Sequence, residues 1–117
     1  MTRHDDSTRL RHMLDYATEA AAMAAGRERA DLEIDRQFLL ALTHLVEIVG
    51  EAATRVSVEG RERWQSIPWR GIVGLRNRLV HGYDAVDMDV LWSVVRDDLP
   101  PLIVELRRIL GNPPDPS

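Results

Sequence analysis

The segment Gly74–Asp84 holds the residue types in this chain that could do chemistry. His81 has the kind of side chain whose unperturbed pKa lies near neutrality, so it suits proton transfer to and from a reacting group. Arg76 offers a planar, charged double donor that suits a phosphate group. Asn77 and Tyr83 add hydrogen-bonding groups to the same stretch. The segment therefore predicts a site that moves protons beside a bound phosphate.

The spacing of these residues sets a geometric condition on such a site. On an ideal helix, which turns by about 100° per residue, Arg76 lies between the apolar Ile72 and Val80, so we expect it on the inward face. Asn77 and His81 lie four residues apart and share a different face. Arg76 and His81 point about 140° apart on a straight helix. They can meet only if the helix unwinds near His81 or if two copies of the segment face each other across a dimer, and the sequence leaves both routes open.

The elements that must position this segment are predicted to be helices, because apolar residues recur at helical spacing and no convincing alternating strand is present. We expect an all-α, four-helix up-down bundle with a kinked or broken last helix, formed by a single domain over residues 1–111 and followed by a disordered, Pro-rich tail over 112–117. The predicted helices run from a cap at Asp5 or Asp6 to a stop at Gly26, from Asp31–Asp35 to about Ser57, from Pro68 to near Gly82, and from a cap at Asp87 through an interruption at Pro100-Pro101.

The second predicted helix is apolar around much of its girth. Leu40 and Ile48 lie well outside its main apolar stripe, so the helix needs cover on more than one side. In a bundle of only four helices that cover could come from a second subunit. We therefore expect a homodimer.

Composition limits the partners and the location. The formal net charge of −4 argues against electrostatic binding of nucleic acid over the whole protein surface. A nucleic-acid partner would have to meet the local basic patch formed by Arg61, Arg63, Arg70, Arg76 and Arg78. The chain lacks Cys, has no apolar run near 18 residues and begins without an apolar leader, so we expect a cytoplasmic protein that does not enter a membrane.

The run Arg76-Asn-Arg-Leu-Val-His-Gly-Tyr83 resembles the R-x4-H-x-Y signature of the HepT-like toxins of the HEPN family. Four further stretches are typical of the same proteins, namely Ile48–Ala52, Ile67–Arg70, Val90–Trp92 and Asp97–Pro101. The resemblance implies a helical dimer whose motif residues line one cleft, and a metal-independent RNase without a cofactor. It also implies a type VII-like toxin–antitoxin module, in which a minimal nucleotidyltransferase antitoxin neutralises the toxin by transferring AMP to Tyr83.

The resemblance assigns a role to each motif residue. His81 would act as acid and base while the 2′-hydroxyl of RNA attacks phosphorus, and Arg76 would stabilise the charge on the phosphate. Asn77 would orient the imidazole or hold a phosphate oxygen. Tyr83 would contact RNA and carry the AMP. RNA contacts are also expected at Arg70 and Arg78.

Other interpretations of the same residues stay open. Arg76 could be paired with Glu47 or Glu51 and tie two helices together. A metal site formed by these two glutamates and His44 is weakly supported, because one helix face supplies all three. Trp64, Trp69 and Trp92 could stack on bases, although core or interface positions are more common. The alternative function is a non-catalytic helical dimer that binds a nucleotidyltransferase or nucleic acid.

Overall fold

The computed structural model describes residues 3–81 and 85–111, without the side chains of Arg3, His4 and His81. Helices dominate the described residues, so the all-α prediction is confirmed. The predicted tail, 112–117, lies outside them. In chain order the elements are α1 (Arg3–Ala24), α2 (Asp31–Ile34), α3 (Arg36–Thr54), α4 (Val58–Arg63), α5 (Trp69–Val73), α6 (Leu75–Leu79), β1 (Val80–His81), β2 (Ala85–Val86), α7 (Met88–Ser93), the π-helix η1 (Val94–Asp98) and α8 (Leu99–Leu110).

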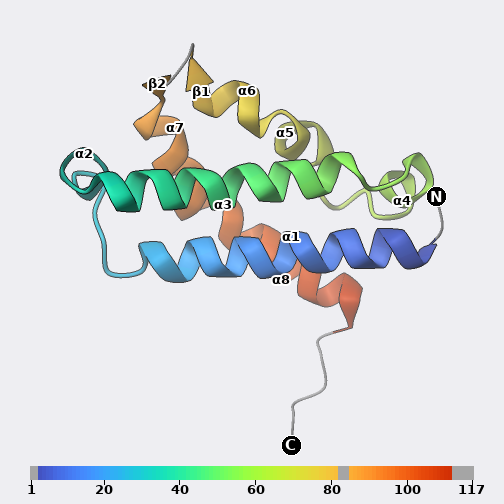
Figure 1. Ribbon diagram of the computed structural model, residues 1–117. Coiled ribbons are helices and arrows are strands. Elements are labelled where there is room, and N and C mark those ends of the chain that lie inside the picture. Colours follow the sequence, from blue (N-terminus) through green and yellow to red (C-terminus); the bar gives the residue numbers. More distant parts are fainter. Residues whose placement is uncertain (1–2, 82–84, 112–117) are drawn as a thin grey trace, which may run out of the picture.

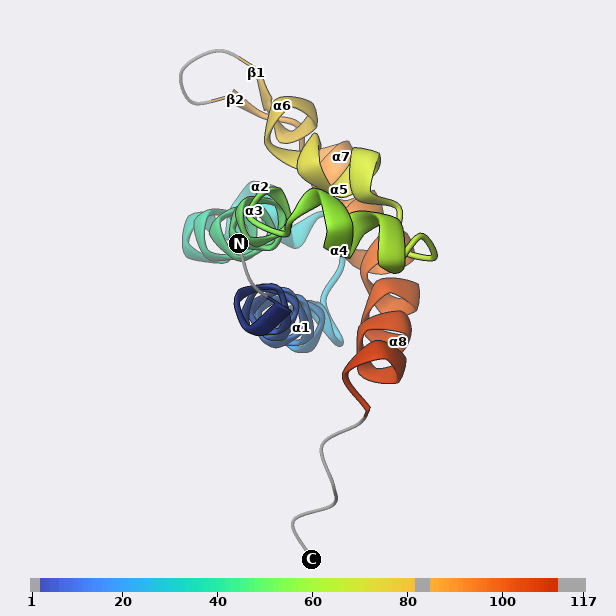
Figure 2. The same cartoon turned by 90° about the vertical axis from the view of Figure 1, so that its right-hand side faces the viewer.

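The two longest helices, α1 and α3, lie antiparallel and side by side (Figures 1 and 2). Ala17, Ala20 and Ala24 of α1 are buried, and such small side chains let neighbouring helix axes approach closely. The turn between the helices passes through Gly26, whose φ of 76° lies in the left-handed region that favours glycine. The predicted stop at Gly26 is therefore confirmed.

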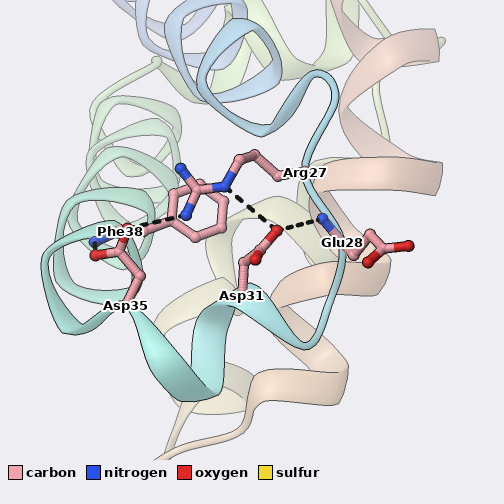
Figure 3. Close-up of polar contacts among 5 residues, drawn as sticks. All are labelled: Arg27, Glu28, Asp31, Asp35 and Phe38. Atoms are coloured by element: carbon pink, nitrogen blue, oxygen red, sulfur yellow. Dashed lines mark hydrogen bonds and ion pairs between the residues drawn. The ribbon is translucent and has the colours of Figure 1, made fainter.

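The start of α3 is held by a cluster of charged residues around Phe38 (Figure 3). The Asp35 carboxylate accepts the Phe38 backbone N–H at 3.1 Å, which caps the helix. Arg27 donates to both Asp31 and Asp35, and its guanidinium lies 4.0 Å from the centre of the Phe38 ring. The Phe38 N–H and the Arg27 guanidinium together hold the pKa of Asp35 below its ordinary value. The predicted second helix is thus divided into α2 and α3 at its capping residue.

The other end of α3 is tied to the N-terminus of the chain by Asp6. The prediction that Asp5 or Asp6 caps the first helix is wrong, because α1 already begins at Arg3. The Asp6 side chain is only 4% exposed and accepts hydrogen bonds from the backbone N–H of Ser57 at 2.8 Å and from its hydroxyl at 2.5 Å. Ser57 does not end the second helix as predicted, since α3 stops at Thr54 and Ser57 caps α4.

The predicted helix from Pro68 to Gly82 is replaced by two five-residue helices and a strand. Gly74 separates α5 from α6, and α6 ends at Leu79. Val80 and His81 then form β1, which pairs antiparallel with β2. No strand was predicted here, because two residues are too few to show an alternating pattern.

The last predicted helix stays helical but changes its hydrogen bonding before the prolines. Asp87 accepts the Val90 N–H at 3.0 Å, so the predicted cap is confirmed. Pro100 and Pro101 have no N–H to offer to the carbonyls four residues earlier. The preceding residues form the π-helix η1, in which the Leu99 N–H donates to the carbonyl of Val94, five residues back. The predicted interruption therefore takes the form of a π-helical segment.

The remaining helices enclose the α1–α3 pair on two sides (Figures 1 and 2). α8 packs across α1, whereas α5 and α6 lie on the side of α3 remote from α1. Leu40 on α3 remains 51% exposed and Ile48 is half-buried, so the described chain leaves part of this helix uncovered. Within residues 3–81 and 85–111, no helix has both the length and the apolar character that crossing a bilayer requires.

Candidate functional site

Arg76 lies on α6 beside the middle of α3. Its side chain is 82% exposed, and its Nε atom is 3.9 Å from Oε2 of Glu47, whose side chain is 30% exposed. An ion pair this long and this open to water contributes little to stability. The guanidinium therefore keeps most of its donors available to another anion.

The expected inward position of Arg76 is wrong. The expectation counted Val80 as part of the apolar stripe, but Val80 has left the helix and belongs to β1. Within α6 the buried residues are Leu75 and Leu79, which are four residues apart and define the inward face. Arg76 then falls at the edge of that face, where its side chain reaches solvent beside α3.

The helix ends before His81, and this bears on how the two motif residues could meet. The Val80 N–H donates to the carbonyl of Arg76, and Leu79 accepts the N–H of Asp87 at 2.7 Å, which closes the base of the β1–β2 pair. His81 lies in β1 opposite Ala85. Because the backbone is already extended there, the angle of a continuous helix does not apply between Arg76 and His81. The His81 side chain and the whole of Tyr83 lie outside the described residues.

The other predicted site residues lie on different sides of this segment. Asn77, Arg70 and Arg78 are all exposed. Arg78 lines a cavity between α5–α6 and η1–α8, whereas Arg76 faces Glu47 on α3. Residues two apart on a helix point about 200° from each other, so α6 presents its two arginines to opposite surfaces. The predicted basic patch is therefore divided by α6.

The alternatives raised by the sequence can be compared with these positions. Arg76 pairs loosely with Glu47 and not with Glu51, whose carboxylate instead accepts a hydrogen bond from the Arg55 guanidinium at 3.3 Å. In the part of the chain that the structure describes, no three His, Asp or Glu side chains gather in a way that could hold a metal ion. His44 is exposed on the same stretch of α3.

The three tryptophans are half-buried and pack against the core. Trp92 meets Phe38 edge-to-face, with ring centres 6.5 Å apart. The Trp69 indole N–H donates to the carbonyl of Trp64 at 3.0 Å. The prediction that they pack in the core is confirmed. These contacts give no support to a role in stacking on bases.

Sequence reasoning missed the polar residues of the cavity, above all Asp98. Asp98 is the last residue of η1, and Ser66 and Glu105 line the same cavity. The signal that was present is the Pro100-Pro101 pair, since a π-helical turn frequently marks a functional position. Which helices enclose the cavity depends on tertiary packing, which the sequence did not reveal.

Comparisons with known proteins agree with the motif. Residues 13–109 match the family described as Ribonuclease HepT-like. A protein of Methanocaldococcus jannaschii that bears the name "putative RNase" is 28% identical over 106 residues, which cover 91% of this chain and 97% of that protein. A "probable ribonuclease HepT" of Thermococcus cleftensis is 35% identical over 72 residues, covering 62% and 66% of the two chains. No solved structure gives a significant match. Since the family match spans most of the sequence, this chain belongs to the HepT-like ribonuclease family.

Proposed function

We propose that this protein is the toxin of a cytoplasmic, type VII-like toxin–antitoxin module and that it cleaves RNA without a metal ion. The observation that carries the proposal is the position of Arg76, which is exposed on a short helix that ends at Leu79, just before His81. An anion-binding group and a titrating group thus follow one another where the backbone leaves the helix. The proposal does not depend on a cofactor.

In the proposed reaction two protons are transferred, and phosphorus exchanges its bond to the 5′-oxygen for a bond to the 2′-oxygen. The 2′-hydroxyl of the substrate loses its proton to a base, and its oxygen bonds to the adjacent phosphorus. The P–O5′ bond breaks, and the 5′-oxygen receives a proton from an acid, which leaves a 2′,3′-cyclic phosphate and a 5′-hydroxyl. His81 serves as base and acid, because an imidazole near its ordinary pKa can take either part at neutral pH. Arg76 binds the non-bridging oxygens and stabilises the charge that gathers on them.

Asn77 and Tyr83 complete the proposed site. Asn77 is exposed on α6 directly beside Arg76, from where its amide could hold a phosphate oxygen or orient the imidazole. Tyr83 follows His81 by two residues and is proposed to contact RNA. It is also the proposed acceptor of AMP from a nucleotidyltransferase antitoxin. An AMP group would add a phosphate and a bulky base to the cleft, so it would repel and block the phosphates of the substrate.

The working form is proposed to be a homodimer in which both copies of the motif line one cleft. The partly uncovered face of α3, with Leu40 exposed and Ile48 half-buried next to Glu47, supports this assembly. Arg76 reaches over the same face. A second copy placed there would bury apolar surface and bring its own motif close to the first.

The test is mapping of RNA 5′- and 3′-ends after brief expression in bacteria that lack the partner gene. Wild type, His81→Ala and Arg76→Ala are compared at equal levels of soluble protein. New ends that carry 2′,3′-cyclic phosphates are expected in wild type only, since loss of an acid–base group lowers a rate by roughly 10²–10⁴-fold. Mass spectrometry of the purified wild-type protein establishes beforehand whether Tyr83 carries AMP.

The proposal fails if all three RNA profiles match those of uninduced cells while unmodified wild-type protein accumulates. That outcome would favour the alternative function, a non-catalytic helical dimer that binds a nucleotidyltransferase or nucleic acid. Cleavage that persists in His81→Ala would instead contradict the assigned mechanism.

A further inference from the structure

A cavity of about 290 Å³ lies on the side of α6 that faces away from Arg76. Its walls are largely apolar and come from α5–α6 on one side, through Ile72 and Leu75, and from η1 and α8 on the other, through Val94 and Leu102. Small-molecule sites in proteins begin at roughly 300 Å³ and combine apolar walls with a few polar groups. The cavity therefore has room for one small planar ring system.

Of the three charged residues that line this cavity, two of opposite sign come from its two sides. Arg78 comes from α6, and Asp98 is the last residue of η1. Within residues 3–81 and 85–111, neither side chain forms an ion pair or a hydrogen bond with another side chain. Both groups are thus available to a ligand.

Glu105, the other carboxylate of the cavity, is already engaged. Arg108 donates to it at 2.9 Å and 2.5 Å, and the Ser66 hydroxyl donates to it as well. These hydrogen bonds, the Arg108 bonds first, lower the pKa of Glu105 to about 2. Its acceptor sites are directed to protein donors, so Asp98 is the carboxylate that can meet a ligand.

The π-helical segment builds the wall that carries this carboxylate. Val94 and Asp98, the first and last residues of η1, both line the cavity. A π-helical turn adds a residue to a helix and changes the direction of the side chains that follow, which is why such turns occur frequently at functional sites.

We propose that this cavity holds one nucleobase of the RNA substrate, with guanine preferred. The inference rests on the proposed ribonuclease function. Single-stranded RNA is recognised by splayed bases that enter pockets and are hydrogen-bonded along their Watson–Crick edges. Guanine presents two parallel donors there, N1–H and the N2 amino group, and a carboxylate accepts two parallel donors best. Adenine, cytosine and uracil offer no such pair to a carboxylate.

The two arginines of α6 connect this subsite to the proposed reaction centre. Arg78 lies at the cavity, where it can contact the phosphate or ribose of the nucleotide whose base is bound. Arg76 lies on the opposite side of the same helix, whose diameter with side chains is about 10 Å. An RNA strand that passes over α6 would therefore place its reacting phosphate one or two nucleotides from the bound base.

The first experiment measures base binding without any need for cleavage. The purified full-length protein is titrated with the 5′-monophosphates of guanosine, adenosine, cytidine and uridine, and with ribose 5-phosphate, while amide proton–nitrogen NMR spectra are recorded. GMP is expected to shift the amides of cavity residues such as Gly71, Ile72 and Leu75, with a Kd of about 1 mM. The other ligands are expected to bind more weakly.

Two pairs of variants locate the interaction. Asp98→Asn keeps the shape of the side chain and removes the double acceptor, so the preference for GMP should fall by about 5- to 100-fold. Asp97→Asn changes the adjacent exposed carboxylate, which does not line the cavity, and should leave the preference intact. Gly71→Leu should block the cavity, whereas Gln37→Leu introduces the same side chain at an exposed position of α3 that does not line the cavity and serves as its control.

The outcomes separate this proposal from the ribonuclease itself. Cavity shifts with GMP that are lost in Asp98→Asn and Gly71→Leu support a guanine site even if no RNA is cleaved. Absent shifts, equal shifts with ribose 5-phosphate, or an unchanged preference in Asp98→Asn would overturn it. Oligonucleotides then give a second readout, since Asp98→Asn should alter the base preference of cleavage whereas His81→Ala should abolish cleavage at every sequence. Cleavage with the same preference in Asp98→Asn would leave the ribonuclease standing and remove the guanine site.

Discussion

The α1–α3 pair and the segment from α5 to β1 lie against each other and differ in helix length, burial and termination. α1 and α3 are long, and their apolar stripes are buried along their whole lengths. The segment consists of two five-residue helices, a glycine between them and a two-residue strand. Among its described side chains, Arg70, Arg76, Asn77 and Arg78 are exposed.

This difference indicates that stability and chemistry are carried by separate parts of the chain. Long helices with continuous burial supply most of the hydrophobic free energy. Short helices that end early present side chains in several directions, which a site needs and a core does not. Substitutions in the segment should therefore change activity with little effect on stability, and substitutions in the helix pair should do the reverse.

Arg76→Ala is the strongest test of the segment. Removal of an electrostatic stabiliser is expected to lower kcat/KM for RNA by roughly 10²–10³-fold. The thermal midpoint should stay within the error of the measurement, because the side chain is 82% exposed and its ion pair with Glu47 is long. Steady-state cleavage assays and thermal unfolding on the same samples measure the two effects.

Arg55→Ala is the matched control for that change. Arg55 is also exposed and also pairs with a glutamate of α3, at 3.3 Å from Glu51, but it lies outside the motif. Its loss should alter neither cleavage nor unfolding appreciably. Equal losses of activity in the two variants would mean that any surface arginine contributes, and the separation of roles would not hold.

Asp6→Ala tests the helix pair in the opposite sense. The buried carboxylate joins α1 to Ser57, and its removal leaves the Ser57 N–H without that acceptor. Loss of hydrogen bonds to a buried charged group costs about 1.5–3 kcal/mol of unfolding free energy. Denaturant unfolding should show this loss, whereas activity per folded molecule should be retained. Asp15→Ala, at an exposed position of the same helix, should change the free energy by less than about 0.5 kcal/mol.

The helix pair could be predicted from the sequence and the segment could not, for a physical reason. Periodicity reports on burial averaged over several turns, so it predicted the long helices α1, α3 and α8, whose apolar residues recur at helical spacing and are largely buried. A five-residue helix contains little more than one turn, and its end is decided by tertiary contacts. The early end of α6 at Leu79 and the exposure of Arg76 were missed for this reason. The motif itself was recognised because it depends on residue identity and spacing. Asp98 was missed because only the folded chain brings it to the same cavity as Arg78.

Gly50→Ala acts where the two regions touch. A Cβ on Gly50 of α3 would come within 3.0 Å of the carbonyl oxygen of Ile72 and 3.5 Å of the Leu75 Cβ. The first of these neighbours is backbone, so α5 has to move. Overpacking of this kind outweighs the gain in helix propensity, and we expect a net loss of about 1 kcal/mol in unfolding free energy. Cleavage should fall several-fold as well, because α5 leads directly into α6, which carries Arg76 and Asn77.

Gly71→Ala provides the comparison for that substitution. Gly71 lies in the exposed part of α5, and its added Cβ meets nothing within 4 Å. The same chemical change should therefore stabilise the protein slightly through helix propensity alone. If Gly50→Ala were equally harmless to both stability and cleavage, the contact between α3 and α5 would not position the motif, and the two regions would be independent.

Glu47→Gln is expected to have the smallest effect and tests whether the helix pair orients the motif at all. The Glu47 carboxylate lies 3.9 Å from Arg76, so it competes with phosphate for the guanidinium and also limits its positions. Removal of the charge should change stability by less than about 1 kcal/mol, since the pair is exposed. Removal of this competing anion should strengthen RNA binding and so lower KM. Looser orientation of the guanidinium should lower kcat by a few-fold, so that KM and kcat fall together.

Glu51→Gln is the control, because it removes a carboxylate one turn away that pairs with Arg55 instead. It should change neither parameter. Identical kinetics for both variants would mean that Arg76 is oriented by the segment alone.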